Sequence, residues 1–150
     1  MIALEDRIKH IVAYYIHLFG TNNPIDIAEA LRIRVLFLPL GKLSGFYKYM
    51  EKNRWIIINS DIENRVLVNV IVAHELGHAI LHPKENSCFM ANHTLLLPSK
   101  IEAQANMFAA YLMVQDSLLI EYEDYPISQI AVCTGLPEEL IKIKFKNIFT

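Results

Sequence analysis

The pentad His74-Glu75-Leu76-Gly77-His78 constrains this chain most, because it places three polar side chains inside segment 69–81, which is otherwise almost entirely apolar. In a helix, one turn separates the two histidines, so both imidazoles point to the same side. Burying three polar side chains without partners is costly. The segment therefore predicts a mostly buried helix whose two histidines share one partner.

A zinc ion is the partner that this spacing predicts. Two neutral imidazoles at positions i and i+4 fit adjacent corners of a tetrahedral zinc site, and Gly77 between them leaves room for another element or a substrate. Glu75 is placed to accept a proton from water that zinc has acidified, the role of a general base in a zinc peptidase. The alternative is an accidental match, with two core histidines bonded to backbone and Glu75 at a solvated edge.

A catalytic zinc needs a third protein ligand, and segment 99–110 offers one. The segment favours a helix and carries a single carboxylate, Glu102, while Asn106 lies one turn further on the same face, where it could orient a ligand. Ser99 and Glu102 also form a capping-box pattern, in which Glu102 would only close the start of the helix. The spacing leaves both interpretations open.

Two motifs together resemble the ImmA/IrrE family of zinc metallopeptidases. They are the run His74 to His82 and the downstream pattern Glu102-x-Gln104-Ala105-Asn106-x-Phe108-Ala109. The resemblance also takes in residues 45–47 and 56–59, so it covers about residues 30 to 145. The first motif is shared by many zinc peptidases, whereas the combination is much more specific.

The resemblance implies zinc on His74, His78 and Glu102, with Glu75 as general base. Many members have a second acid where this chain has Gln104, which leaves Glu102 as the expected ligand. Many also continue Leu-Leu-Met-Pro where this chain reads Leu-Met-Val-Gln at 112–115, a change expected to alter only the helix end.

Composition is that of one small enzyme domain, residues 1–150, large enough for a core and 53% hydrophobic. The net charge of −2 gives no basic surface for nucleic acid, so direct binding to it is not expected. The longest apolar stretch, 66–73, is too short to span a bilayer, and the N-terminus lacks the pattern of a signal peptide. We expect a cytoplasmic protein without membrane contact.

Periodicity predicts an α+β fold: a small zincin-like domain, mostly helical, with a short three-stranded sheet against the central zinc-binding helix. The expected helices span residues 4–19, 23–31, 61 or 62–81, a stretch from 99, 116–122, 128–134 and 137–147. The expected strands are 35–38, 45–49 and 55–59, the last two as a hairpin, and residues 84–98 are expected to form a loop near the site. One edge of this sheet is expected to line the cleft and to hold an extended substrate, and strand 55–59 is the candidate.

Other polar residues are weaker candidates for the site. His82 lies one turn beyond His78, where direct metal contact is less expected than a supporting or surface role. Tyr47 and His93 are candidate donors to the oxyanion formed during hydrolysis, with ordinary packing as the favoured alternative. Cys88 and Cys133 are expected to be reduced thiols, although Cys88 is close enough to His82 in sequence to be considered as a ligand.

These residues are compatible with three functions. The first is a zinc endopeptidase that, by the family resemblance, cleaves a helix-turn-helix repressor of a phage or mobile element. The second is a non-catalytic, zinc-containing module that binds a partner or senses a condition, which would not require an acid at Glu75. The third is a DNA-binding regulator using residues 127–145, whose pattern fits two packed helices better than a DNA reader because charge comes only from Lys142, Lys144 and Lys146.

Overall fold

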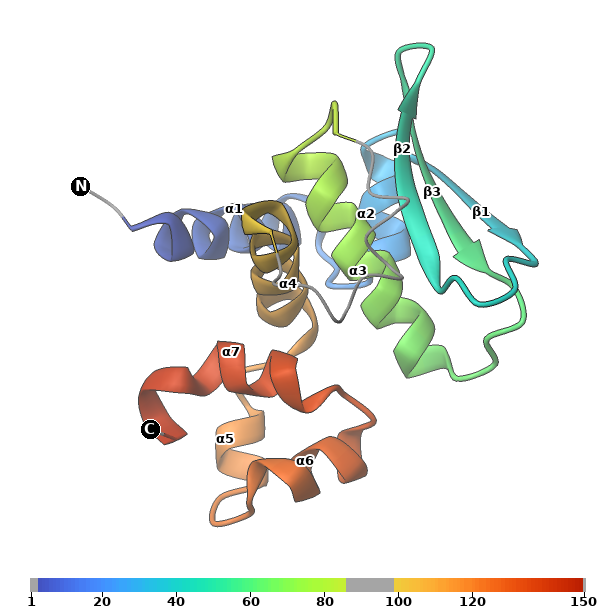
Figure 1. The fold of residues 1–150 in the computed structure, drawn as a ribbon. Coiled ribbons are helices and arrows are strands. Elements are labelled where there is room, and N and C mark those ends of the chain that lie inside the picture. The colour runs from blue at the N-terminus through green and yellow to red at the C-terminus, as the bar shows by residue number, and fades with distance from the viewer. Residues whose placement is uncertain (1–2, 86–98, 150) are drawn as a thin grey trace.

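The computed structural model describes residues 3–85 and 99–149. Its elements, in order, are α1 (Leu4–Phe19), α2 (Pro24–Ala30), β1 (Arg34–Leu38), β2 (Gly45–Met50), β3 (Asn53–Asn59), α3 (Arg65–Leu81), α4 (Lys100–Met113), α5 (Leu118–Glu121), α6 (Ile127–Thr134) and α7 (Glu138–Phe149). Figure 1 shows α3 crossing beside the sheet, with α4 on the other side of α3. The prediction of a mostly helical α+β, zincin-like domain is confirmed.

The first two helices begin and end where the sequence predicts. Gly20 adopts a left-handed conformation with φ of 67° and donates its N–H to the Ile16 carbonyl, which ends α1. The Asn23 side chain accepts from the backbone N–H groups of Ile25 and Asp26, with Pro24 at the first position of α2.

The sheet has the strand order β1-β3-β2. β2 and β3 pair as the predicted antiparallel hairpin, while β1 runs parallel to β3. The expectation that strand 55–59 offers an edge to substrate is wrong, because β3 is the central strand and both of its edges are occupied by β1 and β2. Among the described strands, β2 is the edge strand that also packs against α3.

Helix α3 begins at Arg65, three or four residues later than predicted. Asn64 is the N-cap, and its side chain accepts from the Leu67 N–H. Residues before it stay in a turn held to the sheet, since Ser60 N–H donates to the Leu38 carbonyl and Asp61 N–H to Asn59 Oδ1. The helix ends at Leu81, just before Pro83, as predicted.

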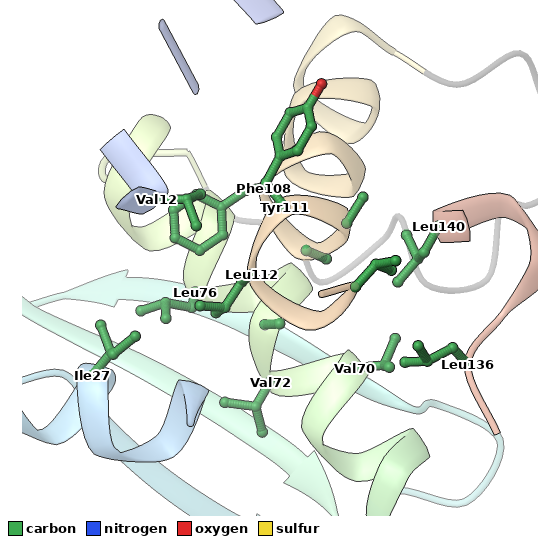
Figure 2. Packing of buried hydrophobic residues seen from close by; sticks show 14 of the residues in the cluster. Val12, Ile27, Val70, Val72, Leu76, Phe108, Tyr111, Leu112, Leu136 and Leu140 are labelled. Atoms are coloured by element: carbon green, nitrogen blue, oxygen red, sulfur yellow. The ribbon is translucent and has the colours of Figure 1, made fainter. Parts of the chain in front are cut away.

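The hydrophobic core gathers around α3 and α4. Figure 2 shows Leu76 and Val72 of α3, and Phe108 and Leu112 of α4, among the buried side chains of this cluster. Leu76, Val72 and Phe108 have no exposed surface. Because these two helices share one densely packed core, their relative position is well determined.

The C-terminal helices pack on each other and on α4, as the helix-packing interpretation expected. Ile130, Leu140 and Ile141 are buried in the interface. Lys144 pairs with Asp116 at 3.0 Å, and Lys146 pairs with Glu5, which also accepts a hydrogen bond from the Tyr111 hydroxyl. These contacts tie α1, α4 and α7 together.

No helix within the two described ranges has both the length and the apolar character required to cross a bilayer.

Candidate metal centre

Helices α3 and α4 pack closely together at Gly77. A Cβ atom built there would lie 3.0 Å from Phe108 Cβ and 3.2 Å from Ala105 Cα. The glycine thus leaves room for a neighbouring element, as its position in the pentad suggested, and that element is α4. The close approach brings the first turn of α4 within reach of the two histidines.

We expect Gly77→Ala to push α4 away from α3. An extra methyl in a filled interface costs about 1–3 kcal/mol, and this one also separates Glu102 from the histidines. Chemical denaturation should show the lower free energy of unfolding, and competition with a chromogenic chelator should show weaker metal binding. Alanine favours a helix more than glycine does, so helix propensity alone would raise the stability of this variant. Unchanged stability and metal affinity in Gly77→Ala would contradict the role given to the close approach.

His74, His78 and Glu102 form a cluster in which one ligand atom from each lies within 4.8 Å of the others. His74 Nε2 is 3.3 Å from Glu102 Oε1, and His78 Nε2 is 2.5 Å from Glu102 Oε2. The imidazole rings have centroids 4.9 Å apart and planes at 83°. Adjacent ligands around tetrahedral zinc are separated by about 3.3 Å, given bonds of about 2.0–2.1 Å. The cluster therefore requires only small side-chain movements to surround such an ion.

The polar atoms of this cluster are poorly satisfied by the protein itself. Both ring nitrogens of His78 and Glu102 Oε2 are buried without a hydrogen-bond partner among the described residues. The 2.5 Å contact between His78 and Glu102 is close enough for an ion pair but lacks hydrogen-bond geometry, and we interpret it as two lone-pair donors directed at a common point. Buried polar atoms without partners are costly, and a divalent cation in the cluster would satisfy His78 Nε2 and Glu102 Oε2.

Electrostatics favours a negative charge on Glu102. Burial raises the pKa of its carboxyl, but the adjacent imidazoles of His74 and His78 outweigh burial and lower the pKa to about 2. Burial lowers the pKa of His74, and interactions with Glu102, Glu75 and Asn106 more than offset this, so the net direction is upward.

Glu102 and Ser99 have separate tasks in the structure. The Ser99 hydroxyl accepts from the Glu102 backbone N–H at 3.3 Å and caps α4, while the Glu102 carboxylate faces the histidines. The two interpretations of this residue pair are thus compatible. The helix cap involves the backbone N–H of Glu102, whereas the metal site would use its carboxylate.

Glu75 is buried beside the cluster, with 5% of its surface exposed. Its charge raises the pKa of the neighbouring His74, so the two side chains interact electrostatically. The side chains of His74 and Glu102 are 21% and 17% exposed, against 1% for His78. The cluster therefore opens to solvent on the side of His74 and Glu102, where a substrate could enter.

The remaining candidates occupy different places. Asn106 lies close enough to His74 to contribute to the raised pKa of its imidazole. His82 lies outside the cluster: its Nε2 is 2.7 Å from Gln104 Oε1, and its ring centroid is 5.7 Å from that of His78. Tyr47 is fully buried, its hydroxyl donates to the Pro83 carbonyl, and burial raises its pKa to about 12.

Two candidates, His93 and Cys88, lie outside the described residues. Cys133 is an exposed free thiol on α6. The contact that sequence reasoning missed is the one between His82 and Gln104, because no spacing rule connects residues on two different helices. The one signal in the sequence is that Gln104 replaces an acid that many family members have at this position.

Comparison with known proteins gives the context for this cluster. The sequence matches the peptidase M78 family model, described as the IrrE N-terminal-like domain, over residues 28–146. It is 38% identical over 140 residues to the uncharacterized immunity region protein 2 of Bacillus phage phi105, covering 91% of this chain and 88% of that protein. It is 31% identical over 145 residues to metallopeptidase ImmA of Bacillus subtilis strain 168, covering 94% and 85%. The matched region contains both helices of the cluster.

Proposed function

The chain belongs to the ImmA/IrrE family of metallopeptidases, and from this premise we propose that it is a zinc-dependent endopeptidase. The observation that carries the proposal is the convergence of His74, His78 and Glu102, with Glu75 buried beside them. Two imidazoles and one carboxylate are a common ligand set of catalytic zinc, which keeps its fourth position for water or substrate. We assign the three residues as zinc ligands and Glu75 as the general base.

The residues of the chain have distinct tasks in this mechanism. Zinc, when bound, polarises the peptide carbonyl and lowers the pKa of water. Glu75 takes the proton of the attacking water and later delivers it to the leaving amine. We assign to Asn106, which lies near His74, the task of orienting its imidazole. The Tyr47 hydroxyl is already bonded to Pro83, so it would have to leave that carbonyl to stabilise an oxyanion.

The proposed substrate is a helix-turn-helix repressor of a phage or mobile element. The family resemblance supports it, and one relative is named as an immunity region protein of a phage. A repressor substrate would place the enzyme in the cytoplasm and make the protein, rather than nucleic acid, its partner. In line with this, two of the lysines near the C-terminus, Lys144 and Lys146, are engaged with acidic side chains.

The test is direct cleavage. Purified protein, mixed with the helix-turn-helix protein encoded beside its gene, should release discrete fragments detectable by mass spectrometry. A chelator should stop the cleavage, and added zinc should restore it. Fragments that form equally well in the chelator would refute the metallopeptidase mechanism. An intact repressor under all conditions, while an unrelated unfolded protein is cut, would refute the substrate alone.

A further inference from the structure

The hydrogen bond between His82 and Gln104 connects the end of α3 to the first turns of α4. His82 is the C-cap of α3, and its backbone N–H donates to the His78 carbonyl at 2.8 Å. Its side chain, at 2.7 Å from Gln104 Oε1, joins the element carrying two proposed ligands to the element carrying the third. His82 Nδ1 is buried and has no hydrogen-bond partner among the described residues, so Gln104 is the polar contact that holds this ring.

Gln104 and Glu102 lie on opposite flanks of the contact between α3 and α4. The centre of that contact on α4 is formed by Ala105 and Phe108, which face Gly77. At 100° per residue, Glu102 projects about 90° to one side of this centre and Gln104 about 70° to the other. The helices are therefore fixed at three points across their interface: the histidine–glutamate cluster, the Gly77 contact and the His82–Gln104 bond.

Rolling of α4 about the Gly77 contact would displace Glu102. A side-chain end lies about 6 Å from the helix axis, so a roll of about 10° moves it by about 1 Å. Zinc–ligand distances tolerate only about 0.2 Å. A second contact on the opposite flank would resist this roll.

We propose that His82 and Gln104 are positioning residues, whose hydrogen bond fixes the roll of α4 and thereby places the Glu102 carboxylate for metal binding. The inference rests on the proposed zinc site and extends it to a pair that does not touch the metal. Partners that hold ligands in place typically contribute about 10–100-fold to metal affinity. We expect an effect near the lower limit, because the packed core also constrains the two helices.

The test compares zinc affinity, measured with a competing chromogenic chelator, among variants of the full chain. Gln104→Met removes the acceptor and His82→Phe removes the donor while both keep similar size; each should weaken zinc binding about 10-fold. If the pair acts as a unit, the double variant should lose no more than either single variant. Gln104→Glu, whose carboxylate can still accept a hydrogen bond from His82, should keep most of the zinc affinity of the parent.

Two readouts separate positioning from a general loss of stability. The visible spectrum of the cobalt-substituted protein should change in Gln104→Met and His82→Phe, because the Glu102 ligand is displaced, and should resemble the parent in Gln104→Glu. Gln129→Met, at an exposed position of α6, is the matched control and should leave both affinity and spectrum unchanged. Should one single variant fail to fold, the other single variant carries the comparison with the parent and with Gln104→Glu.

The outcomes are distinct. Parent-like zinc affinity and cobalt spectra in Gln104→Met and His82→Phe would overturn the inference and leave the proposed function intact. So would additive losses in the double variant. A parent protein that binds neither zinc nor cobalt would overturn the proposed function and the inference with it.

Discussion

Replacing Glu75 with glutamine is expected to abolish peptide hydrolysis while zinc stays bound. Glutamine keeps the size of the side chain but cannot accept the proton of the attacking water, and loss of a general base typically lowers the rate about 10²–10⁴-fold. The proposed ligands His74, His78 and Glu102 are untouched by the change. Cleavage of the repressor, followed by the appearance of fragments, gives the rate, and metal analysis after dialysis gives the zinc content.

Glu63→Gln is the matched control, since Glu63 is exposed before the start of α3. It should cleave at the parent rate. A Glu75→Gln protein that holds zinc and still cuts at the parent rate would show that another group accepts the proton. Loss of zinc from Glu75→Gln would instead show that Glu75 belongs to the ligand set.

Replacing Glu102 with alanine should remove zinc as well as activity. The change takes away the single carboxylate of the cluster and leaves two imidazoles, so zinc affinity should fall by more than about the 100-fold that loss of an orienting partner can cause. Chelator competition measures the affinity, and repressor cleavage measures the activity. Glu121→Ala, at an exposed position of α5, is the control for loss of an acidic residue in a helix.

Ser99→Ala separates the two tasks at the start of α4. Removing the hydroxyl takes away the cap at the Glu102 N–H, which should cost about 1 kcal/mol of stability and leave most of the zinc affinity. If Glu102→Ala lost the same stability as Ser99→Ala but kept zinc, Glu102 would be part of the cap only. The ligand assignment would then be wrong.

Local chemistry made much of this fold predictable. Gly20, Asn23 and Pro24 mark helix ends through their own backbone preferences, so α1 and α2 appear where the sequence places them. The start of α3 was misplaced, because the segment before Arg65 looks helical while Asn64 supplies the cap. A short polar cap signal is easily overlooked beside a long apolar pattern.

Features that depend on packing between distant segments were less accessible. The order β1-β3-β2 follows from how a crossover brings β1 beside β3, and alternation within each strand does not contain that information. The cluster of His74, His78 and Glu102 was anticipated because two motifs pointed to it. The pairing of His82 with Gln104 was not, since it depends on the angle at which two helices cross.

The unequal exposure of the three clustered side chains sets an order of encounter for an incoming ion. An ion that enters from water would contact His74 and Glu102 first, because their side chains are partly exposed. The side chain of His78 is only 1% exposed and lies deepest. Loading would thus proceed from the mouth inward, and the deepest imidazole would complete the coordination. Removal of the ion would follow the reverse order. We therefore expect the ion to dissociate more slowly than it would from a site formed by His74 and Glu102 alone.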